Sequence, residues 1–252
     1  MKLRTLLLTT LALLAATAFA RPLPDIQKSG KLLAATEGAF APFNHFEGSK
    51  LTGFEVELAE LVAKKMGLAI EWKTLGFDAL LTGLGQDRWD LVIASHGITE
   101  ERAKAVTFMA PHYCSGGLIV AKDPAIRTAK DLAGKTVAVQ TGTSYLDNVK
   151  KVAAVKEVKN VPGDGDARAA LVTGRVDAWV SDRFVALEAL RKNPGLKLHA
   201  GELLVTERIA AASAKGNTSL QQAWNQGLAA VLADGSYAQL SKRYFGEDVR
   251  CK

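Results

Sequence analysis

The sequence is poor in cysteine and histidine. Its 252 residues contain two cysteines, Cys114 and Cys251, which are too few for a disulfide-rich scaffold. The four histidines follow no metal-ligand spacing, and the short pattern His112-x-Cys114 is weak evidence for a metal. We therefore predict neither a metal site nor a cofactor.

Runs of basic residues are absent as well. The formal net charge is +6, and it falls to +4 if Lys2 and Arg4 are removed with an N-terminal signal. The positive charges are scattered along the chain and are not gathered in one segment. This pattern is typical of a solvated basic surface, so we expect no nucleic-acid partner.

Long apolar runs are missing except at the N-terminus. The basic stretch MKLR precedes TLLLTTLALLAATA, and Ala18-Phe19-Ala20 has the form of a cleavage site. The run is short for a bilayer span, which favours a cleaved signal peptide at residues 1–20 over a membrane anchor. No cysteine stands at the cleavage point to carry a lipid. We expect a periplasmic protein in which Cys114 and Cys251 form a disulfide, because isolated cysteines pair in an oxidising compartment.

Two pairs of similar segments predict two α/β lobes built on one plan. GKLLAATEG (30–38) and GKTVAVQTG (134–142) each predict a buried strand that ends in a polar turn. ALLTGLGQDRWDLVIAS (79–95) and ALVTGRVDAWVSD (170–182) each combine a helix end, a glycine and an Asp before an apolar strand. The alternative explanation is that the segments are alike only because unrelated βα units use similar residues at helix ends and strand starts. Strands that alternate with helices predict parallel sheets covered on both faces, with ligands beyond the carboxyl ends of the strands.

Arg102 occupies an unusual position. TEERAKAV (99–106) predicts a helix with Thr99 as N-cap, and Glu100 and Glu101 suit the helix dipole. A cation in the first turn costs about 0.3–1 kcal/mol. A surface ion pair is the ordinary explanation, and an anionic ligand is the other. Polar residues end the predicted strands of both lobes, so an Arg from one lobe and Asp182 from the other would suit a zwitterion.

At this point the chain resembles the periplasmic amino-acid-binding proteins that serve ABC transporters, the bacterial extracellular solute-binding protein family 3. The resemblance runs over nearly all of the predicted mature chain. It is carried by the order and spacing of five segments, EGAFAPFNHFEGSKLTGFEVELAELVAKKMG, FDALLTGLGQDRWDLVIASHGITEERAKAVTF, DLAGKTVAVQTGTS, ALVTGRVDAWVSD and LADGSYAQLSKRYFG.

The family's fold is α/β, with two lobes on two parallel-type sheets that are covered by helices on both faces and joined by two hinge crossings. The resemblance implies a first lobe at residues 21–118 and 208–252 and a second lobe at residues 119–207. The crossings would fall near Gly117–Lys122 and Glu207–Ala212.

The resemblance also implies roles for individual residues. Arg102 would grip the ligand's α-carboxylate, which Thr143 and Ser144 would share, and Asp182 would take the α-ammonium. Phe40 and Phe77 would form the walls, and Glu37 would face the end of the side chain. Each role has an alternative, since the two aromatic residues could fill core and Ser144 and Asp182 could cap helices.

The chain departs from the family pattern at two places. Gly97 stands where the family usually has Ser or Thr, which leaves Ser95 a larger share in binding and puts His96 beside the site. The segment FMAPHYCSGG replaces a Ser-Asp-Pro-Tyr-Tyr pattern.

The function implied is capture of a free amino acid, polar or basic, and its delivery to an ABC transporter permease in the inner membrane. We expect a monomer that is not an enzyme. The alternative is an exported enzyme on the same scaffold, similar to cyclohexadienyl or arogenate dehydratases, with Glu37 or His96 as acid or base. A sensor module is a third possibility, which the lack of a further domain in the sequence disfavours.

Overall fold

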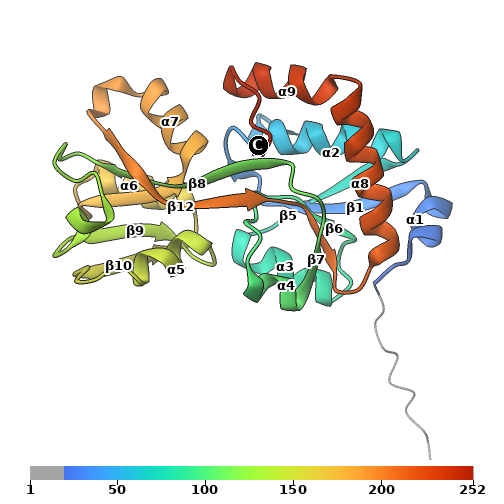
Figure 1. Cartoon of the computed structure of the whole chain (residues 1–252), viewed down its shortest axis with the longest axis horizontal. Helices are drawn as coiled ribbons and strands as arrows, with labels where there is room; N and C mark the ends of the chain where they lie inside the picture. The colour runs from blue at the N-terminus through green and yellow to red at the C-terminus, as the bar shows by residue number, and fades with distance from the viewer. Residues whose placement is uncertain (1–19, 252) are drawn as a thin grey trace, which may run out of the picture.

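The chain folds into two lobes that two long strands connect (Figure 1). The structure is a computed structural model, and it describes residues 20–251. The predicted signal peptide therefore lies outside the described residues, except for Ala20. No helix in the described part of the chain is long and apolar enough to cross a membrane.

The first lobe is built on a five-stranded sheet in the order β5-β1-β6-β13-β7. Its central strand β1 pairs in parallel with β5 and β6, whereas β13 runs antiparallel to β6 and β7. Three short strands that follow β1 in the chain form a separate small antiparallel sheet in the order β2-β3-β4. The strands are β1 (Lys31–Thr36), β2 (Ala39–Phe40), β3 (Asn44–Glu47), β4 (Lys50–Thr52), β5 (Ala69–Thr74), β6 (Leu91–Val92), β7 (Val106–Phe108) and β13 (Ala212–Ala214).

The helices of the first lobe come from both ends of the chain. They are α1 (Leu23–Ser29), α2 (Phe54–Lys65), α3 (Phe77–Gly85), α4 (Glu100–Ala105), α8 (Thr218–Ala233) and α9 (Ser236–Phe245). In α2 the apolar residues recur at helical spacing and are buried. Gly235 separates α8 from α9 with φ of 83°, a conformation that costs glycine little.

The second lobe carries a five-stranded sheet in the order β10-β9-β11-β8-β12. Its elements are β8 (Tyr113–Ala121), the 3-10 helix η1 (Ala129–Leu132), β9 (Thr136–Gln140), α5 (Ser144–Lys150), β10 (Glu157–Val161), α6 (Asp164–Val172), β11 (Ala178–Asp182), α7 (Arg183–Lys192), η2 (Pro194–Leu196) and β12 (His199–Ile209). Strand β9 is parallel to β10 and β11, whereas β8 is antiparallel to β11 and β12. The two-lobed α/β fold is confirmed, with each main sheet mixed rather than wholly parallel.

Strands β8 and β12 pair with each other as they run between the lobes (Figure 1). The segment Gly117–Ala121 of β8 also pairs with β11 and is part of the second sheet. The part of β8 that pairs with β12 alone is Tyr113–Gly116, so the first crossing begins earlier than the predicted Gly117–Lys122. The second crossing approaches the first lobe at Ile209, which forms a bridge with Gly97, in agreement with the predicted stretch Glu207–Ala212.

The predicted disulfide between Cys114 and Cys251 is confirmed. It attaches the chain's C-terminal tail to β8 at the crossing. The Cys114 N–H also donates a hydrogen bond to the Val249 carbonyl at 3.1 Å. The tail that follows α9 is therefore held against the hinge by one covalent bond and one backbone hydrogen bond.

Candidate functional site

A small pocket lies between the two lobes at the carboxyl ends of their strands. Its lining combines residues from both lobes with one from the crossing strand β12. The lining residues are Glu37, Phe40, Phe77, Ser95, Arg102, Gln140, Thr143, Ser144, Tyr145 and Glu207. The enclosed space is about 10 Å³, which is enough for about one water molecule. The space between the lobes is therefore too small for an amino acid in this conformation.

The structure brings together seven of the nine residues predicted to bind ligand. Gly97 and Asp182 are the two that it does not place in the lining. Gln140, Tyr145 and Glu207 line the pocket although the sequence analysis did not select them. The lining fixes where these side chains are, and the binding roles of the predicted residues stay predictions.

Arg102 reaches across the pocket from α4. The Thr99 hydroxyl accepts a hydrogen bond from the Arg102 N–H at 3.1 Å, which confirms Thr99 as the N-cap. The guanidinium donates from Nη1 to the Gly97 carbonyl at 2.8 Å and from Nη2 to the Gly142 carbonyl at 3.0 Å. Within the described residues no carboxylate forms an ion pair with it inside 4.0 Å. The surface ion pair offered as the ordinary explanation is therefore not formed, and burial lowers the pKa of Arg102.

Phe77, the first residue of α3, is held by a buried histidine. The rings of Phe77 and His96 stack with centroids 4.2 Å apart and an angle of 10° between their planes. The Arg102 guanidinium carbon lies 5.8 Å from the centroid of the Phe77 ring. Burial, followed by the positive charge of Arg102, lowers the pKa of His96 well below its ordinary value, so His96 is neutral. Its position behind Phe77 makes it a support for the pocket wall.

Glu37 joins the first lobe to the second. It follows β1, and its Oε1 accepts a hydrogen bond from Gln140 Nε2 at 2.6 Å. Burial raises the pKa of Glu37 to about 7, the hydrogen bond from Gln140 lowers it, and the negative charges of Asp164 and Asp78 raise it further. Glu37 is consequently a carboxyl that changes charge near neutral pH.

A buried polar cluster supports Ser95 from behind. Ser95 has φ of 57°, a left-handed conformation that is uncommon for a residue other than glycine. Glu55 Oε1 accepts from the Ser95 N–H at 2.9 Å, and Oε2 accepts from the Ser95 hydroxyl at 2.9 Å. His112 Nε2 lies 2.9 Å from Glu55 Oε1, and both side chains are buried. Glu55 is fully buried although it is an acid in the first turn of α2.

Thr143 caps α5 at the edge of the pocket. Its hydroxyl accepts from the Leu146 N–H at 3.1 Å and donates to the Gln140 carbonyl at 2.8 Å. Ser144 is the first residue of the helix rather than its cap. Thr143 is therefore the residue that caps α5. The Ser144 hydroxyl accepts no such capping hydrogen bond among the described residues.

Asp182 has the role of a cap in the structure. Its Oδ1 accepts a hydrogen bond from the Phe184 N–H at 2.8 Å, and its carboxylate is 3.4 Å from the Tyr145 hydroxyl. Burial raises the pKa of Asp182 to about 7, against hydrogen bonds from Ser115, Phe184 and Val185 that lower it. Asp182 is therefore a buried helix cap in this structure, and its predicted binding of the α-ammonium stays a prediction.

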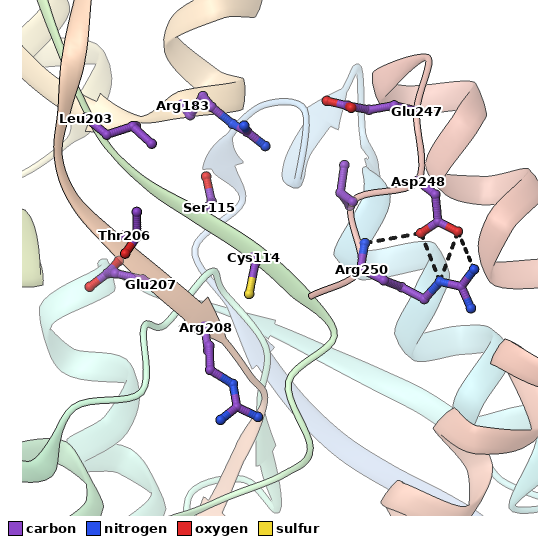
Figure 2. Close-up of a pocket in the computed structure, with 11 residues that line it drawn as sticks. Cys114, Ser115, Arg183, Leu203, Thr206, Glu207, Arg208, Glu247, Asp248 and Arg250 are labelled. Atoms are coloured by element: carbon purple, nitrogen blue, oxygen red, sulfur yellow. Dashed lines mark hydrogen bonds and ion pairs between the residues drawn. The ribbon is translucent and has the colours of Figure 1, made fainter. Parts of the chain in front are cut away.

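A larger groove of about 610 Å³ lies over the crossing strands and the C-terminal tail (Figure 2). Its lining includes Cys114, Arg208 and the ion pair of Asp248 with Arg250. Of the residues around the interlobe pocket, only Glu207 also borders this groove. We therefore take the interlobe pocket as the candidate site. Between residues 20 and 251 no group of three or more His, Cys, Asp or Glu side chains could hold a metal ion.

Comparison with known proteins reveals full-length relatives. The chain is 35% identical over 232 residues to the L-cystine-binding protein TcyJ of Escherichia coli. The match covers 90% of this chain and 87% of the relative. It is 34% identical over 259 residues to a probable amino-acid ABC transporter-binding protein of Haemophilus influenzae, covering 98% of this chain and 99% of that protein.

Solved structures give the same result. An ancestral arginine-binding protein bound to arginine superposes with a TM-score of 0.83 at 38% identity, covering 86% of this chain and 99% of the other. An ancestral arginine-binding protein bound to glutamine superposes with a TM-score of 0.82 at 39% identity over the same shares. The family model of bacterial extracellular solute-binding proteins, family 3, matches residues 32–247. The chain therefore belongs to the bacterial extracellular solute-binding proteins of family 3.

Proposed function

We propose that this protein captures a free amino acid between its two lobes and delivers it to the permease of an ABC transporter. The observation that carries the proposal is the pocket itself. It lies between the two hinged lobes. The Arg102 guanidinium and the Glu37 carboxyl both line it, and so do two aromatic side chains. Family membership and relatives named as amino-acid-binding proteins support it.

The charges of the pocket favour a polar or basic amino acid. Arg102 suits the α-carboxylate, because a guanidinium can pair with both oxygens of a carboxylate. Glu37 suits a side chain that donates hydrogen bonds, whereas an acidic side chain would place like charges together. The similar proteins named for cystine and arginine, and the structures that hold arginine and glutamine, are compatible with this range.

The enzymatic alternative finds less support in the geometry. An acid or base must reach the reacting atoms. His96 lies behind the Phe77 ring and is buried, so it is poorly placed for that work. Glu37 lines the pocket, and its pKa of about 7 would suit an acid or base. Turnover of prephenate or arogenate by the purified protein would establish the enzymatic alternative, and we expect none.

The same proposal includes location and assembly. We expect cleavage after Ala20, export to the periplasm and a monomer that meets the permease at the inner membrane. The N-terminal signal in the sequence, the disulfide and the membership of an extracellular family support this assignment. N-terminal sequencing of the exported protein checks the cleavage, and light scattering checks the monomer.

Thermal shift with a panel of ligands tests the proposal. The panel comprises the twenty common amino acids together with ornithine and cystine. A ligand at 100 times its Kd adds about 2.7 kcal/mol of stability, which corresponds to several degrees of Tm. We expect one or a few polar or basic members to raise Tm, with titration calorimetry confirming the hit. A panel in which no amino acid raises Tm would contradict the proposal.

A further inference from the structure

His112 lies where the two crossing strands meet the first lobe. It immediately precedes β8, and its N–H donates a hydrogen bond to the carbonyl of Ile209, the last residue of β12, at 2.9 Å. Its own carbonyl accepts a hydrogen bond from the Tyr237 hydroxyl of α9. Only 3% of the residue is exposed. The backbone of His112 is therefore fixed on both sides, which gives its ring a defined position inside the lobe.

The His112 ring is directed at a buried carboxylate. Its Nε2 lies 2.9 Å from Oε1 of Glu55, which is itself fully buried in α2. Glu55 also receives the N–H and the hydroxyl of Ser95, both at 2.9 Å, and the Asn44 amide at 3.3 Å. Each oxygen thus has two donors, and together they match the four lone pairs of a carboxylate. His112 Nε2 therefore carries a proton, because a carboxylate can only accept.

Ser95 needs this support because its backbone is held in an unfavourable conformation. Its φ of 57° lies in the left-handed region, which a residue with a Cβ atom adopts rarely. Such a conformation persists only where neighbouring groups fix it. Both the N–H and the hydroxyl of Ser95 are bound to Glu55, and Ser95 lines the interlobe pocket. The Glu55 carboxylate thus determines how Ser95 faces the pocket.

His112 supplies its donor at a place where the chain departs from the family pattern. It belongs to FMAPHYCSGG, the segment that replaces Ser-Asp-Pro-Tyr-Tyr. Its buried side chain is not among those that line the pocket, so direct contact with a ligand gives it no role. Without His112, one oxygen of the buried carboxylate would lose a donor, which costs free energy. Glu55 would then turn toward other donors and loosen its hold on Ser95.

We propose that His112 is a positioning residue for ligand binding. Its ring orients the Glu55 carboxylate, which in turn holds Ser95 in the conformation that meets the ligand. The inference rests on the proposed function and deepens it, because it adds a residue outside the pocket to the binding machinery. Since the His112 N–H is bonded to β12, the same residue ties this side of the pocket to the crossing strands.

Titration calorimetry with the amino acid found in the thermal-shift panel tests this role. His112→Leu removes the N–H donor of the ring, whereas His112→Gln keeps an N–H donor on a side chain of similar reach. His199→Leu is the matched control, because it removes an exposed histidine from β12. Circular dichroism and the Tm without ligand show whether each variant is folded.

We expect His112→Leu to weaken binding by about tenfold, the loss typical of a hydrogen bond to a charged group. His112→Gln and His199→Leu should stay within about threefold of the wild-type affinity. The loss should also require the carboxylate, so that in a Glu55→Gln background His112→Leu changes the affinity by less than about threefold. A histidine that only stabilises the fold would lower Tm without this rescue and without this dependence on Glu55.

Hydrogen exchange of the Ser95 amide, followed by NMR in the ligand-free wild type, gives a test that needs no variant to fold. Exchange should be slow, because Glu55 accepts a hydrogen bond from this amide. Fast exchange would overturn the inference, as would a folded His112→Leu protein with wild-type affinity or equal losses with and without the Glu55 carboxylate. These results would leave the proposed function standing. A wild-type protein that bound no amino acid of the panel would overturn the proposed function and this inference with it.

Discussion

Gln140 Nε2 donates a hydrogen bond to Glu37 Oε1 over 2.6 Å, and this contact joins the second lobe to the first. Burial at this contact raises the pKa of Glu37 from an ordinary 4.5 to about 7. An acid whose pKa is raised holds its proton more tightly in the closed state than in the unfolded chain. Its contribution to stability is therefore greatest below pH 4.5 and is lost as the pH rises to about 7. A cationic ligand has the opposite requirement, because it needs the ionised carboxylate.

We predict that binding of L-arginine strengthens with pH. Between about pH 6 and about pH 8 the ionised fraction of Glu37 rises roughly tenfold, and the association constant should rise by a similar factor. L-Glutamine, which is neutral in its side chain, should show a much smaller change. Titration calorimetry at the two pH values measures both.

Glu37→Gln is the control for this prediction. The variant retains Asp182 and Asp164, whose pKa values burial also raises, to about 7 and about 6. We expect it to weaken L-arginine far more than L-glutamine and to remove the pH dependence. If the variant keeps the same pH profile, another carboxyl is responsible and Glu37 has a structural role.

A second prediction concerns the disulfide of Cys114 with Cys251. The bond closes a loop with a sequence separation of 137, and a chain-entropy estimate for such a loop is about 5 kcal/mol at most. Reduction should therefore lower the free energy of unfolding by up to this amount and release the tail after α9. Urea unfolding with and without reductant measures the difference, and thiol titration of the denatured, unreduced protein should find no free thiol. Two titratable thiols would show that the bond does not form.

Much of the fold follows from local patterns in the sequence. The helix at 54–65 has regular apolar spacing, and Thr99 and Gly235 mark helix ends by their own chemistry. The start of the first crossing was placed wrongly because an apolar run does not reveal where pairing with β11 begins. That pairing joins Gly117 to Asp182, which is far away in the sequence.

The site divides in the same way. Glu37 and Ser95 follow predicted strands, whose carboxyl ends meet at one edge, and Arg102 drew notice by its place in a helix; their predicted roles came from the family resemblance. The place of Glu207 in the pocket could not be predicted. Its contact with Gly97 joins distant parts of the chain, and no pattern in the sequence reveals such a contact. The unusual glycine at 97 was the available signal, because it indicated a missing side chain that another residue could replace. Glu55 was missed because an acid in the first turn of a helix is ordinarily exposed.

A third prediction concerns that buried Glu55. It holds the Ser95 N–H and hydroxyl and contacts His112. Glu55→Ala should lower the free energy of unfolding by about 3–5 kcal/mol, because it leaves buried polar groups without their partner. Glu60→Ala, an exposed acid on the same helix, should cost less than about 1 kcal/mol. Urea unfolding decides this, and similar losses in the two variants would show that Glu55 is not a structural anchor.

The last prediction concerns Arg102. The sequence suggested an unfavourable first-turn position for this cation, but α4 is only six residues long and Arg102 lies in its last turn, where the helix dipole does not oppose a cation. The structure orients its guanidinium on two backbone carbonyls, and no described carboxylate pairs with it within 4.0 Å. If a ligand carboxylate is its natural partner, Arg102→Ala removes one member of a buried charge pair. Such a loss typically costs about 2–5 kcal/mol, or roughly 30-fold to several thousand-fold in affinity. Arg102→Lys should recover only part of it, because an ammonium cannot make the paired contact of a guanidinium.

The fold should survive the Arg102→Ala substitution, since only two hydrogen bonds are lost. Titration calorimetry with the amino acid found in the thermal-shift panel, together with circular dichroism, measures both effects. A folded Arg102→Ala protein that binds as tightly as the wild type would show that Arg102 is not part of the binding site.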